Sequence, residues 1–278
     1  MNTANYTTIK AQIDKHGFAI KKKFGQNFLI DQNMVDKIVK GAQITADDVV
    51  IEVGPGLGSL TTTLAQHCQQ VICVEIDTQV IPILEEMAPE NVTIVQGDIL
   101  KLDIEALIAP YESVKVVANL PYYIAAPIVT RFLETKVKSL TMMMQKEVAD
   151  RMRAPHRTKD YGSLTLFVNY HAQVSLVTQV ARTCFLPRPN VDSTVLHFKL
   201  EKKYHPKDEE LFLKLIRAAF SQRRKTMVNS LEKEMGLDKR QIGELLQGLG
   251  LSEKARAEEL DMMHYVALSD NISKAMKL

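Results

Sequence analysis

Short apolar runs that alternate with helical segments restrict the fold of this chain more than any other feature. Runs typical of buried strands occupy residues 48–53, 71–76, 92–95, 114–118 and 139–144. Helical periodicity precedes or separates them, over residues 33–41, 59–68, 78–87 and 127–135. This alternation predicts βαβ units with right-handed crossovers, and hence an α/β, Rossmann-like fold with a doubly wound, mostly parallel sheet.

The last part of the chain has a different pattern. Residues 163–200 hold further strand-like stretches, including 173–180 and 193–200, and a turn follows at Tyr204-His205-Pro206. Beyond it, helical periodicity covers residues 208–220, 224–235, 238–248 and 262–276. We therefore predict an α/β domain over residues 1–204, with an N-terminal arm at 1–30, and a small all-helical domain over 205–278.

The composition is that of an ordinary globular protein, with 46% hydrophobic and 24% charged residues. No apolar run reaches the roughly 18 residues that a membrane span needs, and no secretory signal is visible. The three cysteines, at 68, 73 and 184, have no CxxC spacing, and the histidines do not cluster. We expect a cytoplasmic protein without disulfides, without a metal site and, since nothing indicates a coiled coil, a monomer.

The charge is nearly balanced, at +2, but it is unevenly distributed. Lys and Arg outnumber Asp and Glu in three segments, at residues 10–23, 136–159 and 214–225. Basic clusters in a near-neutral chain are typical of a protein that binds a polyanion on one face. Each cluster taken alone is equally compatible with a solvated helix face.

The first strand runs into the Gly-rich turn Glu52-Val53-Gly54-Pro55-Gly56-Leu57-Gly58. Glycines at 54 and 56 allow a tight turn and a close approach of a ligand to the backbone. A nicotinamide-dependent enzyme needs its third glycine one residue later, under a pyrophosphate. S-adenosylmethionine has no phosphate, so the observed spacing favours this cofactor.

Acids at the ends of the next two strands support the same cofactor. Glu75 ends the second strand, 21 residues after Gly54, which is the right distance for hydrogen bonds with both ribose hydroxyls. Asp98 follows the third strand, where its carboxylate suits the exocyclic amine of the cofactor adenine. We therefore predict that Gly54, Gly56, Glu75 and Asp98 bind S-adenosylmethionine.

The fourth strand ends in Asn119-Leu120-Pro121-Tyr122, which we predict to be the catalytic segment. The lone pair of an adenine N6 amine is delocalised into the ring, so the amine is a poor nucleophile. The Asn119 side-chain oxygen and the Leu120 carbonyl are two acceptors that favour a tetrahedral nitrogen. Pro121 fixes the turn, and Tyr122 offers a face on which a flipped base can stack.

With these motifs, the sequence resembles the ribosomal RNA adenine dimethyltransferases, and within them the bacterial small-subunit group. The resemblance spans roughly residues 15–278. Besides the two motifs above, it rests on Phe24-Gly25-Gln26-Asn27-Phe28-Leu29, Gln96-Gly97-Asp98, Tyr123-Ile124, Phe185-Leu186-Pro187-Arg188-Pro189-Asn190-Val191-Asp192-Ser193 and Phe220-Ser221-Gln222-Arg223-Arg224-Lys225. The last two segments are specific to this family.

The resemblance implies two methyl transfers to each of two adjacent adenosines. These lie in the 3′-terminal hairpin loop of 16S ribosomal RNA, within the 30S subunit or its late precursor. It also implies cofactor contacts at Asn27, Leu29, Gly54, Glu75, Asp98 and Asn119. In this family the C-terminal helical domain helps to dock the particle, and Arg223, Arg224 and Lys225 are our candidates for phosphate contacts.

The sequence departs from the family pattern at Ala125 and Ala126, where small hydroxyl residues often precede Pro127. Three other functions compete with the proposed one. Related resistance enzymes methylate large-subunit RNA, but the Asn-Leu-Pro-Tyr-Tyr motif at 119–123, Pro55 and the long basic C-terminal segment favour the small-subunit group. A DNA adenine methyltransferase would usually need a target-recognition domain. The third alternative is an assembly factor whose retention on the particle matters more than methylation.

Overall fold

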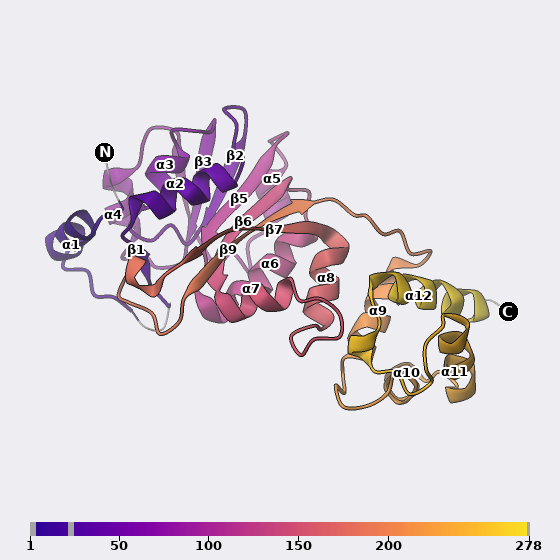
Figure 1. The fold of residues 1–278 in the computed structure, drawn as a ribbon. Coiled ribbons are helices and arrows are strands. Elements are labelled where there is room, and N and C mark those ends of the chain that lie inside the picture. The colour runs from indigo at the N-terminus through magenta and orange to yellow at the C-terminus, as the bar shows by residue number, and fades with distance from the viewer. Residues whose placement is uncertain (1–3, 22–24, 277–278) are drawn as a thin grey trace. The chain divides into compact units, whose positions relative to one another are not determined.

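The apolar runs pair into one central sheet. In the computed structural model, which describes residues 4–21 and 25–276, the strand order is β4-β3-β2-β5-β6-β9-β7 (Figure 1). Strands β2 to β6 pair in parallel with one another, and β9 runs antiparallel to β6. The doubly wound, mostly parallel sheet is confirmed. Its strands are β2 (Val49–Val53), β3 (Gln70–Glu75), β4 (Val92–Gln96), β5 (Val114–Asn119), β6 (Ser139–Gln145), β7 (Ala172–Val180) and β9 (Ser193–Leu200).

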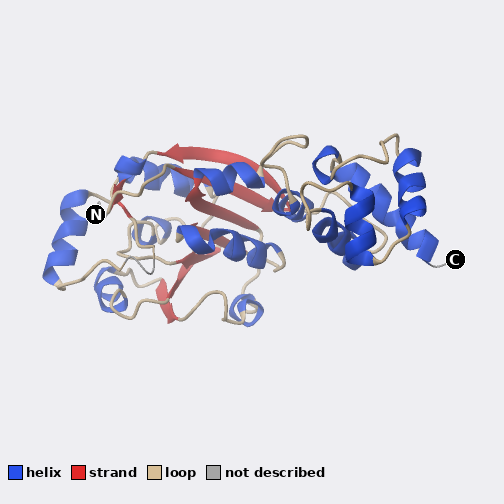
Figure 2. Ribbon diagram, turned by 90° about the horizontal axis from the view of Figure 1, so that it is seen from below, coloured by secondary structure: helices blue, strands red, loops and turns tan. Residues whose placement is uncertain are grey.

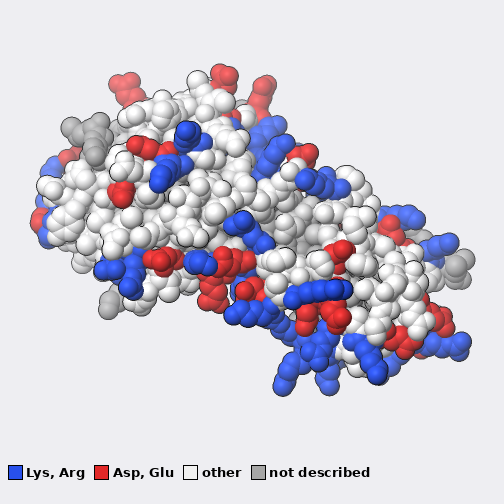
Figure 3. Space-filling model, in the orientation of Figure 1, with Lys and Arg blue, Asp and Glu red and all other residues white. Residues whose placement is uncertain are grey.

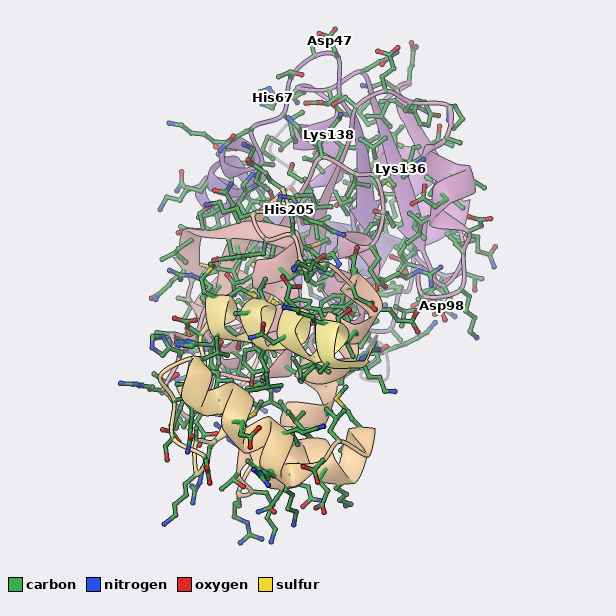
Figure 4. All side chains as sticks on the ribbon, turned by 90° about the vertical axis from the view of Figure 1, so that its right-hand side faces the viewer. Asp47, His67, Asp98, Lys136, Lys138 and His205 are labelled. Atoms are coloured by element: carbon green, nitrogen blue, oxygen red, sulfur yellow. The ribbon has the colours of Figure 1, made fainter. Side chains whose placement is uncertain are left out.

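The chain changes its winding direction between β2 and β5. Val53 at the end of β2 is level with Val74 of β3 on one side and Ala118 of β5 on the other. Since β3 and β4 extend the sheet in one direction and β5 and β6 in the other, a crevice opens at the carboxyl ends of these strands. Asp98 lies at this end of the sheet, and Asp47 and Lys138 lie at the opposite end (Figure 4).

Both faces of the central strands are covered, which explains why they appear in the sequence as continuous apolar runs. Every residue of β2 is buried. Val50, Cys73 and Val117 belong to one hydrophobic cluster together with side chains of the helices that follow β2 and precede it. The helices of this part are α1 (Tyr6–Lys15), α2 (Gln32–Gly41), α3 (Thr61–Leu64), α4 (Ile81–Met87), α5 (Ile104–Ile108), α6 (Ala125–Leu133) and α7 (Lys146–Met152), with a 3-10 turn η2 (Tyr122–Ile124) before α6.

The remaining helices have a core of their own. They are α8 (Ser163–His171), α9 (Glu209–Ala219), α10 (Met227–Met235), α11 (Lys239–Gly248) and α12 (Met262–Met276), with the 3-10 turn η4 (Ala257–Glu259). A further 3-10 turn, η3 (Arg182–Cys184), lies between β7 and β8 and belongs to the α/β part. Leu166, Phe212 and Tyr265 are buried together in this second cluster. Gly236 ends α10 in a left-handed conformation, with φ of 69°, as its position in the sequence predicts.

Contacts divide the chain into two compact units. The first contains the residues up to Ala149 together with Gln173–Leu200, and the second contains Asp150–Ala172 and the chain from Glu201. Strands belong to the first unit, and the second has only helices and loops (Figure 2). The sequence-based boundary at 204/205 differs from this division, because Tyr161, Leu166 and Tyr170 pack with the C-terminal helices.

Several elements differ from the sequence-based prediction. Residues 163–171 form helix α8 inside the stretch in which we expected strands, and α3 is much shorter than 59–68. Helix α10 begins at Met227 instead of residue 224, because Thr226 is its N-cap and accepts a hydrogen bond from the Asn229 amide at 3.4 Å. Residues 22–24, which belong to the first basic segment and to the 24–29 motif, lie outside the described residues.

A small second sheet joins two of the family motifs. Strand β1 (Phe28–Leu29) pairs antiparallel with β8 (Phe185–Leu186), with Leu29 opposite Phe185. The Ile30 amide adds a hydrogen bond of 2.8 Å to the Cys184 carbonyl. The motif at 185–193 therefore holds the N-terminal motif beside the carboxyl ends of the strands of the main sheet.

Over the part of the chain that is described, no helix combines the length and apolar content needed to cross a bilayer.

Candidate active site

A cavity of about 220 Å³ opens at the carboxyl ends of the parallel strands, within the α/β unit. Residues from the ends of β2, β3, β4 and β5 line it, together with the segment that contains β1. All residues for which the sequence predicts a cofactor or catalytic role line this cavity: Asn27, Leu29, Gly54, Gly56, Glu75, Asp98, Asn119, Leu120, Pro121 and Tyr122. Arg223, Arg224 and Lys225 belong to the other unit.

The Gly-rich turn has the backbone conformation that its glycines permit. Gly54, Gly56 and Gly58 have φ values of 65°, 55° and 75°, which side-chain-bearing residues rarely adopt. A Cβ at Gly54 would meet no heavy atom within 4 Å, so this position leaves open space at the cavity wall. A Cβ at Gly56 would lie 3.0 Å from the Phe28 ring. The turn therefore leaves room for a ligand at Gly54 and for the β1 segment at Gly56.

Glu75 presents a fixed carboxylate at the end of β3. The residue is 6% exposed, Oε1 accepts a hydrogen bond of 2.8 Å from the Asp77 amide, and Oε2 accepts one of 3.3 Å from the Gly56 amide. Burial raises the pKa of Glu75 and these backbone hydrogen bonds oppose the rise. Each oxygen has a further lone pair, so the carboxylate is suited to accept hydrogen bonds from a pair of ribose hydroxyls.

Asp98 lies one strand further along the same edge, after β4 (Figure 4). Its Oδ1 accepts a hydrogen bond of 3.0 Å from the Leu100 amide, which orients the side chain. The carboxylate remains partly exposed, at 27%, and Oδ2 lies 3.8 Å from Nζ of Lys101. Asp98 is thus an oriented acceptor that can meet an amine in the cavity.

Asn119 is oriented by a residue far away in the sequence. Its Nδ2 donates a hydrogen bond of 2.9 Å to the Asn27 carbonyl, 92 residues earlier. Because the amide nitrogen is engaged, Oδ1 is left as the acceptor that can face a ligand. Within residues 4–21 and 25–276, no group donates a hydrogen bond to that oxygen. The neighbouring Leu120 amide is fixed by a 3.0 Å hydrogen bond to the Met143 carbonyl on β6.

Tyr122 is anchored by its hydroxyl. The hydroxyl lies 2.8 Å from Oγ of Ser193, the last residue of the 185–193 motif and the first of β9. Burial raises the pKa of Tyr122, whereas the hydrogen bond with Ser193 lowers it. The next residue, Tyr123, also lines the cavity and is 62% exposed. One tyrosine ring is therefore held in place and a second stands at the rim.

Glu52 also lines the cavity, a position that no motif in the sequence predicted. It is 1% exposed, and burial raises its pKa to about 7, against hydrogen bonds with Thr61 and Cys73 that lower it. Cys73 Sγ lies 3.6 Å from Glu52 Oε2. The sequence does contain a signal for a functional role of Glu52, namely an acid within an otherwise apolar strand. A buried carboxylate in such a run requires a compensating partner or ligand.

The charge of the lining distinguishes between cofactors. Glu52, Glu75 and Asp98 all line the cavity, and the described lining residues include no Lys, Arg or His. Such a surface fits a cationic ligand like S-adenosylmethionine, which carries a sulfonium and an ammonium group, and disfavours a pyrophosphate. Over residues 4–21 and 25–276, no group of three His, Cys, Asp or Glu side chains could hold a metal ion.

The predicted RNA contacts lie at the surface of the helical unit. Arg223, Arg224 and Lys225 are exposed in the connection between α9 and α10. Lys and Arg side chains gather at this edge of the unit (Figure 3). The 136–159 segment is divided between the units, because Lys136 and Lys138 belong to the α/β unit and residues from 150 onward to the helical unit. Lys138 lies at the end of the sheet opposite to Asp98 (Figure 4).

A doubly wound sheet with this Gly-rich turn, acids after the next two strands and an acidic cavity defines a class I S-adenosylmethionine-dependent methyltransferase. A family model described as "Ribosomal RNA adenine dimethylase" matches residues 17–274. The chain therefore belongs to the ribosomal RNA adenine dimethylase family. It is an adenine N6-dimethyltransferase for ribosomal RNA, and S-adenosylmethionine is its methyl donor.

Relatives and solved structures agree with this family. "Ribosomal RNA small subunit methyltransferase A" of Clostridioides difficile (strain 630) is 44% identical over 279 residues, which covers 97% of this chain and 96% of that protein. The protein of the same name in Geobacillus thermodenitrificans (strain NG80-2) is 44% identical over 276 residues, with 94% of each covered. A dimethyladenosine transferase from Plasmodium falciparum has a TM-score of 0.75 at 26% identity, with 88% of this chain and 97% of that chain covered. The 23S rRNA methyltransferase ErmE has a TM-score of 0.70 at 27% identity, with coverages of 89% and 100%.

Proposed function

We propose that this enzyme dimethylates N6 of two adjacent adenosines in the 3′-terminal hairpin loop of 16S ribosomal RNA. Its substrate is the 30S subunit or a late precursor, and it contributes to small-subunit biogenesis in the cytoplasm as a monomer. The relatives named small-subunit methyltransferases, about 44% identical over nearly the whole chain, support this choice of RNA. The observation that supports the chemistry best is the orientation of Asn119, whose Nδ2 is held by Asn27 and whose Oδ1 is left as an acceptor.

The proposed role of Asn119 and Leu120 is to shape the nucleophile. Oδ1 of Asn119 and the Leu120 carbonyl accept hydrogen bonds from the two N6 hydrogens of adenine. This draws the nitrogen lone pair out of conjugation and directs it toward the methyl donor. The bound cofactor supplies an electrophilic methyl group, so the chain provides position and orientation in place of a strong base. The N–C bond would form at the expense of the methyl–sulfur bond of the donor, which leaves a neutral thioether, and the surplus N6 proton would leave to solvent.

The proposed role of Tyr122 is to hold the target base. Its ring stands beside the acceptors in the same cavity lining, and the hydroxyl contact with Ser193 fixes its plane. Stacking on an aromatic side chain contributes about 1–3 kcal/mol per base. Pro121 has φ of −58° and ψ of 128°, and it begins the 3-10 turn that presents the ring. The helical unit, through Arg223, Arg224 and Lys225, provides phosphate contacts that are independent of the target base.

Tritiated S-adenosylmethionine and 30S particles from a strain that lacks this methylation provide the test of the substrate. We expect label only in unmethylated 30S, recovered after digestion as N6,N6-dimethyladenosine. Methylated 30S, 50S subunits and a DNA duplex are the controls. Label in 50S RNA would place the activity with the large-subunit enzymes, and absence of label despite cofactor binding would leave an assembly factor as the better description.

The Asn119→Ala variant tests the chemistry. We expect kcat to fall by about 10²-fold or more, the magnitude found when one oriented hydrogen-bonding group is removed from an active site. Asn271→Ala is the matched control, because Asn271 is exposed on α12. An Asn119→Ala enzyme with unchanged kcat would refute the acceptor role, and intact particle binding in this variant would separate catalysis from docking.

A further inference from the structure

A buried carboxylate that belongs to none of the sequence motifs ties the N-terminal arm to the end of β3. Asp77 lies two residues beyond Glu75, and it is 2% exposed. Its Oδ1 lies 2.7 Å from Nζ of Lys21, and its Oδ2 accepts a hydrogen bond of 2.9 Å from Nε2 of Gln26. Each oxygen therefore contacts a different residue of the arm, across more than 50 positions of sequence.

The two arm residues are also bound to each other. The Lys21 amide donates a hydrogen bond of 2.8 Å to Oε1 of Gln26. Because Oε1 accepts from Lys21 and Nε2 donates to Asp77, both ends of the Gln26 amide have a partner and only one orientation satisfies them. Asp77, Lys21 and Gln26 thus form a closed set of hydrogen bonds that fixes the position of Gln26 within the 25–29 segment.

This set is connected to the cavity in two ways. Gln26 precedes Asn27, whose carbonyl accepts the hydrogen bond from Asn119, and both Gln26 and Asn27 line the cavity. On the other side, the Asp77 amide donates to Oε1 of Glu75 at 2.8 Å. A displacement of Asp77 or Gln26 would therefore shift both Glu75, whose carboxylate is proposed to bind the ribose, and Asn119, whose side-chain amide is proposed to bind the target amine.

Asp77 also begins the turn into α4, because its Oδ1 accepts a hydrogen bond of 3.1 Å from the Gln79 amide. This local role needs one oxygen only and leaves the contact between Oδ2 and Gln26 unexplained. Burial raises the pKa of Asp77, but hydrogen bonds from Lys21, Gln79 and Gln26 outweigh it and the pKa is lowered. The carboxylate is thus kept in the charged form that Lys21 and Gln26 bind.

We propose that Asp77 is a positioning residue, which holds residues 25–29 in the place where Asn27 and Leu29 line the cofactor cavity. The proposal rests on the cofactor role of that cavity and is independent of which RNA is the substrate. Asp77 is not among the residues that line the cavity; it acts through Gln26, and through Asn27 on Asn119.

The Asp77→Asn variant tests the proposal. The shape of the side chain and the acceptor for the Gln79 amide are kept, but an NH₂ group now faces Nε2 of Gln26, and two donors cannot bond. A flip of the Gln26 amide would lose the bond from the Lys21 amide instead. We expect the Kd for S-adenosylmethionine, measured by calorimetry without RNA, to rise about tenfold or more. Amide hydrogen exchange should accelerate in peptides that cover 25–31 and stay unchanged in α4.

A double-mutant cycle identifies the contact. Gln26→Ala removes the arm side of the same hydrogen bond, so the double variant Asp77→Asn/Gln26→Ala should bind the cofactor no more weakly than Gln26→Ala alone. If the two effects multiply instead, Asp77 acts by another route and the proposal is wrong.

Glu86→Gln is the matched control, because Glu86 on α4 also bonds the arm, through Lys15 and His16, but at the surface and away from residues 25–29. This variant should bind the cofactor within about twofold of wild type. An Asp77→Asn protein that binds within the same limit, or whose exchange accelerates in α4 and not at 25–31, would overturn the positioning role. Since RNA is absent from these measurements, a wrong RNA assignment would leave their result unaffected.

Discussion

Replacing Glu52 by Gln should make the ligand-free enzyme more stable at alkaline pH and flatten its dependence on pH. Glu52 is 1% exposed, within β2, and its pKa of about 7 means that the folded protein holds a proton that an exposed Glu has already lost. The hydrogen bonds with Thr61 and Cys73 only partly offset the burial. Gln reproduces the neutral form of this side chain at every pH.

The sign and size follow from the two pKa values. Between the ordinary value of 4.5 and about 7, the folded state binds more protons than the unfolded state, so stability falls as the pH rises through this range. The difference between the two pKa values corresponds to a stabilisation of the folded state of about 3 kcal/mol, at 1.36 kcal/mol per pKa unit. This stabilisation is fully lost above about pH 7. Below about pH 4.5 both states are protonated, so the stability no longer changes with pH through this group.

Urea unfolding of wild type and Glu52→Gln, followed by far-UV circular dichroism at about pH 5 and about pH 8, measures this effect. We expect similar stabilities at the lower pH and an advantage of about 3 kcal/mol for the variant at the higher pH. Glu85→Gln, at an exposed position on α4, is the control. Equal changes with pH in wild type and Glu52→Gln would refute the reasoning. At the higher pH, where Glu52 of the wild type is ionised, the variant should also bind the cationic cofactor more weakly, because the cavity has lost a negative charge.

Three further predictions concern other parts of the molecule. Asp48 is 2% exposed, and although burial raises its pKa, hydrogen bonds from Lys115, Ser113 and Thr45 lower it to about 2. Lys115→Met should therefore destabilise the protein by about 3 kcal/mol at neutral pH in urea unfolding. Wild type should lose stability as the pH falls from 3.8 through about 2, because Asp48 becomes protonated, and Asp48→Asn should not show this loss. Equal acid sensitivity of Asp48→Asn and wild type would contradict this. Tyr122→Phe should retain most of kcat/KM on 30S particles, because only the Ser193 hydrogen bond is lost. Tyr122→Ala should lower kcat/KM by about 10–100-fold, because the stacking face is lost as well. Similar losses in both variants would exclude stacking as the main role of Tyr122. Replacing Arg223, Arg224 and Lys225 together by Gln should reduce the slope of log affinity for RNA against log salt by roughly one per phosphate contact, and parallel salt plots would show that these residues do not contact phosphates.

The strands and the cofactor turn were predictable because their signals are local. Strands β2, β3, β5 and β6 are largely buried on both faces, so the apolar runs themselves mark them, whereas β4, at the edge of the sheet, is only partly buried. The positive φ values at Gly54, Gly56 and Gly58 need only the absence of a Cβ, which is visible in the sequence. Glu75, Asp98 and Asn119 follow consecutive strands, and parallel pairing alone brings such positions to one edge.

Helix lengths and the grouping of residues into units were less predictable. Residues 59–68 have apolar spacing typical of a helix, yet regular helix covers only Thr61–Leu64, because the preceding Gly-rich turn extends to residue 60. Residues 150–172 precede the last strands in sequence but bury Tyr161 and Tyr170 among the C-terminal helices. Periodicity shows that a face is apolar, but it does not show against which partner that face is buried.

The sequence by itself therefore determined the class of fold, the Gly-rich turn and those lining residues that end or follow the strands, such as Glu75, Asp98 and Asn119, but not Glu52. Only the tertiary structure decided how those side chains are oriented: Asn27 holds Asn119 across 92 residues, Ser193 holds Tyr122 across 71, and Asp77 holds Gln26 across 51. A strand or turn depends on neighbours within a few residues, and its pattern is therefore present in the sequence. A hydrogen bond between distant segments depends on the packing of the whole sheet and of the arm beside it, and no local pattern encodes it.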